Sequence, residues 1–145
     1  MPRSIHDNYV LGYSVDIEAR SIVIRTEKRD GGQAVERTDV RFHGVLGYHI
    51  RDSLGGILTG IYSCELESLA RDYSFSILFE EWDKWAWPFQ GCEGDPIAYA
   101  KAAGATAFHV ESAIGFDGFV VCRSMAIEAA QPDDASDERR SGARA

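Results

Sequence analysis

The sequence predicts an α+β domain: a mostly antiparallel sheet of about six strands, with two or three helices on one face. Three observations lead to this prediction. Apolar and polar residues alternate with the period of two of half-buried strands, both early and late in the chain. Between these regions the apolar residues recur with the spacing of amphipathic helices. Turn signals such as Asp30-Gly31-Gly32 separate the elements, so the expected order is four strands, the helices and two more strands.

The first three strands are expected to form an antiparallel meander, because each alternates in polarity and short turns connect them. In the first strand, for example, Tyr9, Tyr13 and Val15 share one face. The fourth has apolar residues on both faces, which is typical of a central or doubly covered strand. The last two are expected on either side of the turn signal Gly-Phe-Asp-Gly. The predicted strands cover residues 9–17, 21–28, 38–43, 54–64, 105–114 and 118–128.

The helical region begins at Glu65 and carries two apolar stripes on opposite sides of one helical wheel. A single straight helix cannot bury both stripes, so a break is expected near Asp72–Ser74, where a side chain can cap the second helix. A third helix is expected to begin at the cap-and-proline pair Asp95-Pro96 and to end at Gly104. The stripes are Leu66, Leu69 and Tyr73, and Phe75, Leu78, Phe79, Trp82, Trp85 and Ala86.

Residues 1–130 are expected to form one domain, because a chain of 145 residues can bury a core without metal or disulfide staples. The tail, residues 131–145, has no aromatic and no large aliphatic side chain, so we expect it to be disordered. The start of the chain, MPRSIHDNYV, lacks the apolar region of a signal peptide, and no apolar run is long enough for a transmembrane helix. Three cysteines without a CxxC pair favour reduced thiols, so the expected compartment is the cytoplasm.

The charge balance narrows the classes of partner. The formal net charge is −8 and the pI about 4.9, so no basic surface is expected to bind nucleic acid or an anionic membrane. An acidic protein can attract a basic protein partner, although acidity equally serves solubility alone. No cofactor is expected, and the composition leaves the oligomeric state open.

The stretch FEEWDKWAWPFQGCEGD, Phe79 to Asp95, is the strongest candidate for a binding site. Trp82 and Trp85 share a helical stripe with Phe75, which predicts a position in the core. Trp87 and Phe89 either cover the end of the sheet or stay half exposed as an anchor for a partner. The predicted partner-binding residues are Trp87, Phe89, Glu80, Glu81, Asp83, Glu93 and Asp95.

An alternative ligand site centres on His109 and Glu111, which occupy positions i and i+2 on one strand face. Such a pair can supply two metal ligands or an oriented base. His43 and Asp39, on the polar face of the third strand, are the available further ligands. With Arg41, that face can equally hold cross-strand ion pairs or form a recognition surface. No second pair has metal-ligand spacing, so a metal is not expected, and a solvated strand face is the simpler interpretation.

Motifs that would indicate catalysis are absent from the sequence. The glycines occur in no phosphate-binding context, and neither a GxSxG nucleophile elbow nor a Cys/His signature is present. The favoured function is therefore a non-enzymatic, cytoplasmic protein-binding module. Because convergent sites need no motif, the alternative is a small-ligand-binding protein or an enzyme, with a cleft between sheet and helices.

Three stretches carry a resemblance to known proteins: HDNYVLGYSVDIEARSIVIRTE, TDVRFHGVLGYHI and SAIGFDGFVVCRSMAIE. In layout and strand pattern the chain, from Tyr9 to Glu128, resembles small uncharacterised bacterial α+β proteins. Some proteins of this make-up are immunity proteins encoded beside polymorphic toxins. The resemblance implies an acidic inhibitor of a basic toxin or effector, and it brings no catalytic motif with it.

Overall fold

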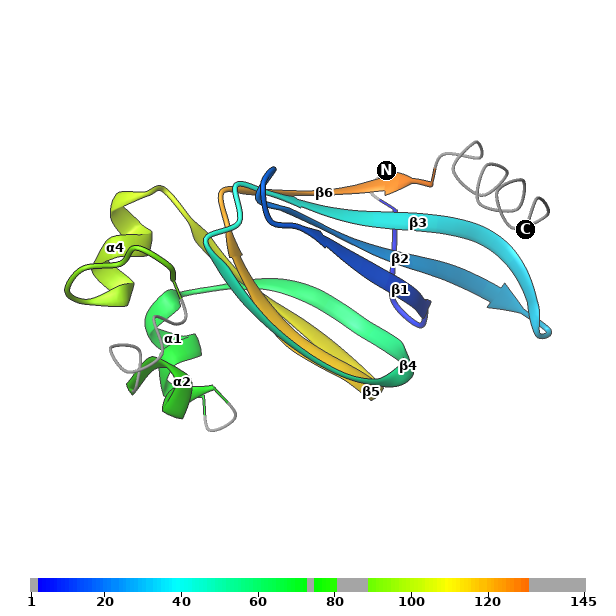
Figure 1. The fold of residues 1–145 in the computed structure, drawn as a ribbon. Helices are drawn as coiled ribbons and strands as arrows, with labels where there is room; N and C mark the ends of the chain where they lie inside the picture. Colours follow the sequence, from blue (N-terminus) through cyan, green and yellow to red (C-terminus); the bar gives the residue numbers. More distant parts are fainter. Residues whose placement is uncertain (1–2, 73–74, 81–88, 131–145) are drawn as a thin grey trace, which may run out of the picture.

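The computed structural model describes residues 3–72, 75–80 and 89–130. Within them lies a six-stranded antiparallel sheet in the order β5-β4-β1-β2-β3-β6, with short helices between β4 and β5 (Figure 1). The α+β prediction and its order of elements are thereby confirmed. The strands are β1 (Tyr9–Asp16), β2 (Ser21–Asp30), β3 (Gln33–His43), β4 (Gly47–Cys64), β5 (Thr106–Cys122) and β6 (Ser124–Ala129). The helices are α1 (Leu66–Arg71), α2 (Ser76–Glu80) and α4 (Pro96–Ala102).

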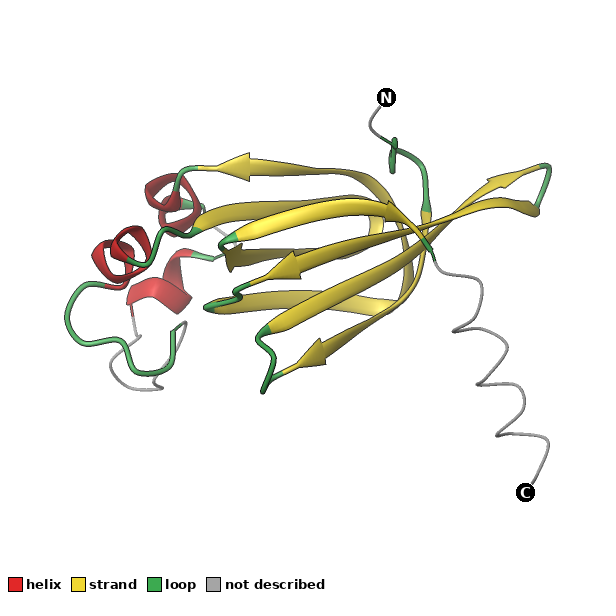
Figure 2. Ribbon diagram, turned by 90° about the horizontal axis from the view of Figure 1, so that it is seen from above, coloured by secondary structure: helices red, strands yellow, loops and turns green. Residues whose placement is uncertain are grey.

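The sheet curls into a half-barrel because β5 and β6 are two parts of one bent chain segment. Only Arg123 separates them, yet β5 pairs with β4 at one edge and β6 pairs with β3 at the other. The backbone N–H of Arg123 donates to the carbonyl oxygens of His43 (3.1 Å) and Gly44 (3.3 Å), which fixes the bend against the end of β3. One bent segment therefore supplies both edges of the curled sheet (Figures 1 and 2).

The expected reverse turn at Gly-Phe-Asp-Gly is not formed, because β5 runs through it. Gly115 has a φ of 74° and forms an irregularity in the β4–β5 ladder, opposite residues 53–56. Gly118 pairs with Ile50, and a Cβ atom there would lie 2.2 Å from the carbonyl oxygen of His49. Gly115 therefore allows a bulge, and Gly118 allows close approach of the two strands. Both are common roles of glycine within a strand, as opposed to a reverse turn.

The inner face of the curled sheet holds the larger core. Ile22, Ile24, Val40 and Phe42 of β2 and β3 are fully buried there, together with Val110 and Val120 of β5. Residues before β1 also pack on this core, where Ile5 is buried. The Asn8 side-chain amide donates to the Thr26 hydroxyl (3.0 Å), which donates to the Thr38 carbonyl (2.9 Å).

A second core joins the helices to the opposite face of β5. Figure 2 shows the helices gathered at one end of the strands. Leu66 and Leu69 of α1 and Ala100 of α4 pack in one cluster with Ala107, Phe119 and Val121 of β5. The side chains of Phe75, Phe79 and Phe89 complete this cluster.

The predicted start, end and break of the helices agree with the structure. α1 ends at Arg71 and α2 begins at Ser76, which brackets the expected break. Asp95 caps α4, Pro96 is its first residue, and Gly104 follows it with a φ of 74°. Trp82, Trp85 and the tail, residues 131–145, lie outside the described residues. In the part of the chain that the structure describes, no helix is long and apolar enough to cross a membrane.

Candidate functional site

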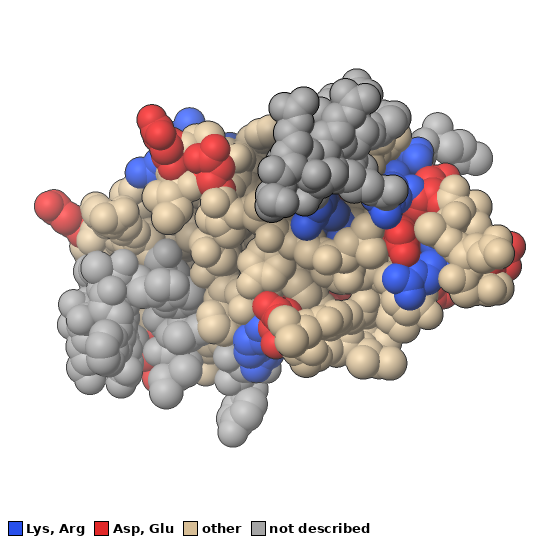
Figure 3. Space-filling model, turned by 45° about the vertical axis from the view of Figure 1, so that its right-hand side comes forward, with Lys and Arg blue, Asp and Glu red and all other residues tan. Residues whose placement is uncertain are grey.

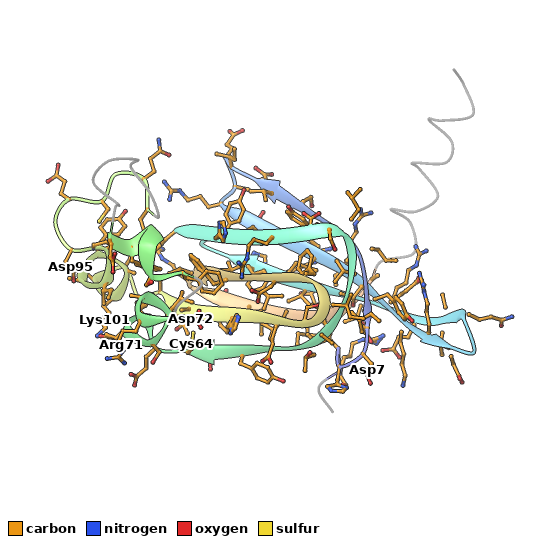
Figure 4. All side chains as sticks on the ribbon, turned by 90° about the horizontal axis from the view of Figure 1, so that it is seen from below. Asp7, Cys64, Arg71, Asp72, Asp95 and Lys101 are labelled. Carbon is orange, nitrogen blue, oxygen red and sulfur yellow. The ribbon has the colours of Figure 1, made fainter. Side chains whose placement is uncertain are left out.

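The segment that contains the helices, residues 65–103, carries most of the net negative charge of the protein. Its sequence has eight acidic and three basic side chains, a net charge of −5 out of −8. We call it the acidic helical segment. Its described helices stand together at one end of the molecule (Figure 1), beyond the strand ends. Figure 4 shows Arg71, Asp72 and Lys101 near one another there, and Asp7 at the far end.

Some carboxylates of this segment are committed to its own structure. The Asp95 carboxylate accepts a hydrogen bond from the backbone N–H of Ala98 (3.2 Å) and thus caps α4. Glu67 of α1 accepts a hydrogen bond from Lys101 of α4. This bond lowers the pKa of the Glu67 carboxyl and raises that of the Lys101 ammonium group.

Other carboxylates of the segment remain open to a partner. Glu65, Glu80 and Glu93 are exposed, and within the described residues none of them makes an ion pair. Two of these, Glu80 and Glu93, belong to the predicted binding surface. An exposed carboxylate that makes no ion pair contributes to the field that attracts a basic partner.

Phe89 is buried, so of the two predicted alternatives, a cover over the sheet end and a half-exposed anchor, it is not the half-exposed anchor. Its side chain is 2% exposed, stacked on Tyr99 of α4 (ring centroids 6.1 Å apart) and edge-on to Phe79 (6.3 Å). It therefore cannot serve as an exposed anchor in this conformation; it holds the loop before α4 against the helices. Trp87, Glu81 and Asp83, also predicted to bind a partner, lie outside the described residues.

On the outer face of β2, β3 and β6, by contrast, the carboxylates are paired with arginines. Glu27 binds Arg29 (2.7 Å) and Arg37 (3.6 Å). Arg41 bridges Asp39 of its own strand and Glu128 of β6, both at 3.3 Å. Figure 3 shows acidic and basic side chains lying next to one another on the surface. The polar row of β3 thus forms the ion pairs that its spacing permits, and His43 lies exposed at the end of the strand.

His109, the centre of the alternative site, contacts Asp117 and not Glu111. Its Nε2 atom lies 3.1 Å from Asp117 Oδ1, and Arg51 donates to the other carboxylate oxygen at 2.5 Å. A straight strand would separate residues eight apart by about 26 Å. The contact therefore depends on the strong curvature of β4 and β5 in their middle (Figure 1). Glu111 is exposed, opposite Gly60.

A second imidazole and an aromatic ring complete this group, which we call the histidine cluster: His49, Arg51, Phe75, His109 and Asp117. The Phe75 ring meets His49 edge-on at 6.1 Å and His109 at 5.8 Å between centroids. The Arg51 guanidinium carbon lies 5.5 Å from the centre of the same ring. Burial lowers the pKa of His49, and the nearby Arg51 charge lowers it further against the opposing effect of Asp117.

The cluster has the geometry of an oriented base, because a carboxylate fixes one ring nitrogen of His109 and leaves the other for a proton. It does not include His43 or Asp39. These lie on β3, which three strands separate from β5 in the sheet. Among the described residues no group of three or more His, Cys, Asp or Glu side chains could hold a metal ion.

Three members of the histidine cluster, His49, Arg51 and Asp117, were missed in the sequence analysis. Arg51 and Asp117 are cross-strand partners, and His49 faces Phe119, so their proximity follows from the β4–β5 register. One signal in the sequence could have indicated part of the cluster. Arg51 and Asp117 have opposite charges and lie in two segments that the order of elements allows to pair as strands.

The cysteines do not offer a reactive thiolate. Burial raises the pKa of Cys122 to about 12. Burial also raises the pKa of Cys64 and of Cys92, with Asp72 and Asp95 adding to the effect. Because the thiolate is the nucleophile, these environments do not favour covalent chemistry at sulfur.

Comparison of the chain with protein-family models, with curated proteins and with solved structures found no significant match. The functional argument therefore rests on the charges and contacts of the chain itself.

Proposed function

We propose that this protein is a non-enzymatic binding module that receives a basic protein partner on the acidic helical segment. One observation carries the proposal: the acidic helical segment has a net charge of −5, out of −8 for the whole chain. Within it Glu80 and Glu93 are exposed and make no ion pair with a described residue, whereas Glu27, Asp39 and Glu128 on the outer face of β2, β3 and β6 are paired with arginines.

The physical consequence is a directed field. A surface of one sign raises the rate at which an oppositely charged partner arrives, and salt weakens this effect over a Debye length of about 8 Å at physiological ionic strength. An immunity-type inhibitor of a basic toxin or effector is the form of binding module that the resemblance suggests. Three free thiols, at Cys64, Cys92 and Cys122, support a reducing compartment, the cytoplasm.

The test uses two charge-matched variants. Glu80→Gln/Glu93→Gln removes two charges from the acidic helical segment, and Glu18→Gln/Asp30→Asn removes two exposed charges from turns of the sheet. A partner captured from the native lysate is purified, and its association rate with each variant is measured at several salt concentrations. We expect the first variant to associate more slowly and with weaker salt dependence, while the second resembles the unmodified protein. Equal rates for the two variants would refute the proposal.

A second candidate function is supported by the histidine cluster. Asp117 holds His109 by one ring nitrogen, an arrangement in which the imidazole can bind a polar ligand or accept a proton. A small-molecule library can be screened against 15N-labelled protein by NMR. A ligand that shifts the His109 ring signals, and that Asp117→Asn weakens, would favour this function over protein binding. Screening hits that leave both imidazoles unchanged would count against it.

A further inference from the structure

A hollow of about 490 Å³ lies where four parts of the chain meet: the β1–β2 turn, the bend between β5 and β6, the β3–β4 connection and the C-terminal half of α4. The side chains of Arg20 and Arg123 line it from the first two. Tyr99 of α4 and Leu46, just before β4, supply apolar surface. A neighbouring hollow of about 280 Å³ shares Arg20 and Leu46 with it. We call the first of these the arginine hollow.

The backbone fixes both arginines in place. Arg20 has a φ of 53°, in the left-handed region that residues with a side chain seldom adopt, and its carbonyl accepts the N–H of Val45 at 2.9 Å. Arg123 occupies the bend between the two sheet edges. Its aliphatic stem crosses Gly44, where a Cβ atom would lie 3.0 Å from three of its side-chain carbons. The backbone of Arg20 and the stem of Arg123 are thus held in place, and both arginine side chains are exposed to solvent.

These two arginines differ in their surroundings from three arginines of the sheet. Arg29, Arg41 and Arg51 each bind a carboxylate. Neither Arg20 nor Arg123 makes an ion pair or a side-chain hydrogen bond within the described residues. The nearby Asp16 carboxylate is held in its own turn, where it accepts the N–H of Ala19 at 2.9 Å. Two arginines that line one hollow, whose lining includes no carboxylate, suit an oxyanion that can accept several hydrogen bonds.

The C-terminus of α4 lies beside the hollow, and two of its carbonyl groups are hydrogen-bonded within the chain, which reduces their repulsion of an anion. α4 ends near the hollow, and carbonyl groups at a helix C-terminus carry partial negative charge. Here Gly104 N–H donates to Lys101 (3.0 Å) and Ala105 N–H donates to Ala100 (3.1 Å), so the last turn satisfies carbonyls internally. The arginines therefore dominate the local charge.

We propose that the arginine hollow binds a phosphate group, held by Arg20 and Arg123. Two sources share this chemistry: free inorganic phosphate, and a phosphate ester whose organic part lies against Tyr99 and Leu46. This site is separate from the partner surface proposed above, because its cations come from the β1–β2 turn and the β5–β6 bend and not from the exposed carboxylates of the acidic helical segment.

The experiment titrates the 15N-labelled protein with inorganic phosphate, with methyl phosphate and with phenyl phosphate, at constant ionic strength with chloride as the blank. The Nε–Hε signals of the arginines are monitored by NMR. We expect those of Arg20 and Arg123 to shift with saturation in the millimolar range. A loss of one charge-assisted contact should weaken binding about tenfold in Arg20→Asn and in Arg123→Gln. Asparagine is chosen at position 20 because it tolerates the left-handed region.

Arg25→Gln is the matched control, because Arg25 is an exposed β2 arginine that does not line the hollow. It should bind phosphate like the unmodified protein, and equal melting temperatures would show that all variants are folded. Tighter binding of phenyl phosphate than of inorganic or methyl phosphate would identify an aromatic ester as the better ligand; equal affinities would identify the free anion. Shifts no larger than the chloride blank, or equal weakening in Arg25→Gln, would overturn the proposal.

Discussion

Removing the Phe75 ring should detach the acidic helical segment from β5 more effectively than any other single change in the described residues. The ring is fully buried and packs edge-on against Phe119, with centroids 4.8 Å apart, and against both imidazoles of the histidine cluster. Phe→Ala substitutions in cores cost about 3–5 kcal/mol of unfolding free energy. Aromatic pairs contribute roughly 0.5–1.5 kcal/mol beyond their buried area, so the upper part of that range is expected.

The assay is thermal unfolding monitored by circular dichroism. For Phe75→Ala we expect the midpoint of thermal unfolding to fall by roughly 10–20 °C, given about 3–5 °C per kcal/mol for a domain of this size. Phe75→Leu keeps most of the volume and should cost only about 1–1.5 kcal/mol. Val35→Ala, at a side chain that is 62% exposed, is the control and should change stability by less than about 0.5 kcal/mol.

The same variant should change the titration of His49. Burial is the main cause of its lowered pKa, and removal of the Phe75 ring admits water beside the imidazole. In Phe75→Ala the pKa should therefore rise toward the ordinary value of 6.5, as followed by the ring proton signals in NMR. A loss of less than about 1 kcal/mol, with an unchanged His49 titration, would show that Phe75 does not hold the helices to the sheet.

Three further predictions concern single features. Folding lowers the pKa of His49 below its ordinary value of 6.5, so the folded protein resists protonation of this side chain. The resulting stability is fully present above pH 6.5 and is lost as the pH falls below it. His49→Gln should therefore flatten the pH dependence of the urea unfolding midpoint below pH 6.5. Asp95→Ala should cost about 1 kcal/mol through loss of the α4 cap, and Asp95→Asn should restore most of it. Deletion of residues 131–145 should change the melting midpoint by the equivalent of no more than about 0.5 kcal/mol; a larger loss would mean that the tail docks.

Elements with local signals were predictable from the sequence. The β2–β3 hairpin follows from Asp30-Gly31-Gly32, and both central glycines have positive φ. Likewise α4 lies between a cap-and-proline pair and a left-handed glycine. In these cases the residues that fix the conformation are within a few positions of it, so no tertiary information is needed.

The path of β5 was not predictable in the same way. A glycine with positive φ serves a reverse turn and a strand bulge equally well, so Gly115 alone does not distinguish them. The partner strand determines that β5 continues through Gly115. β4 pairs with β5 on both sides of its own irregularity at residues 53–56. The break falls instead at Arg123, where the chain passes from one sheet edge to the other.

The candidate site shows the same division between local and distant information. His109 was recognisable by its residue type and position, but the spacing rule that joined it to Glu111 treats the strand as straight. Curvature brings Asp117 to His109, and the register brings Arg51 to Asp117. Pairing between residues 66 apart in the chain depends on long-range strand association, which no local pattern encodes.

The two proposed surfaces are connected by α4, and this bears on whether they act independently. Asp95 at the start of the helix adjoins the exposed carboxylates, whereas Tyr99 and Ala103 at its end line the arginine hollow. Packing of Ala100 and Phe89 in one cluster with Ala107, Phe119 and Val121 holds this short helix against β5 in a single arrangement. Coupling between two sites requires an element with two arrangements. Phosphate in the arginine hollow should therefore leave the partner's association rate unchanged, apart from screening that a chloride salt at equal ionic strength reproduces.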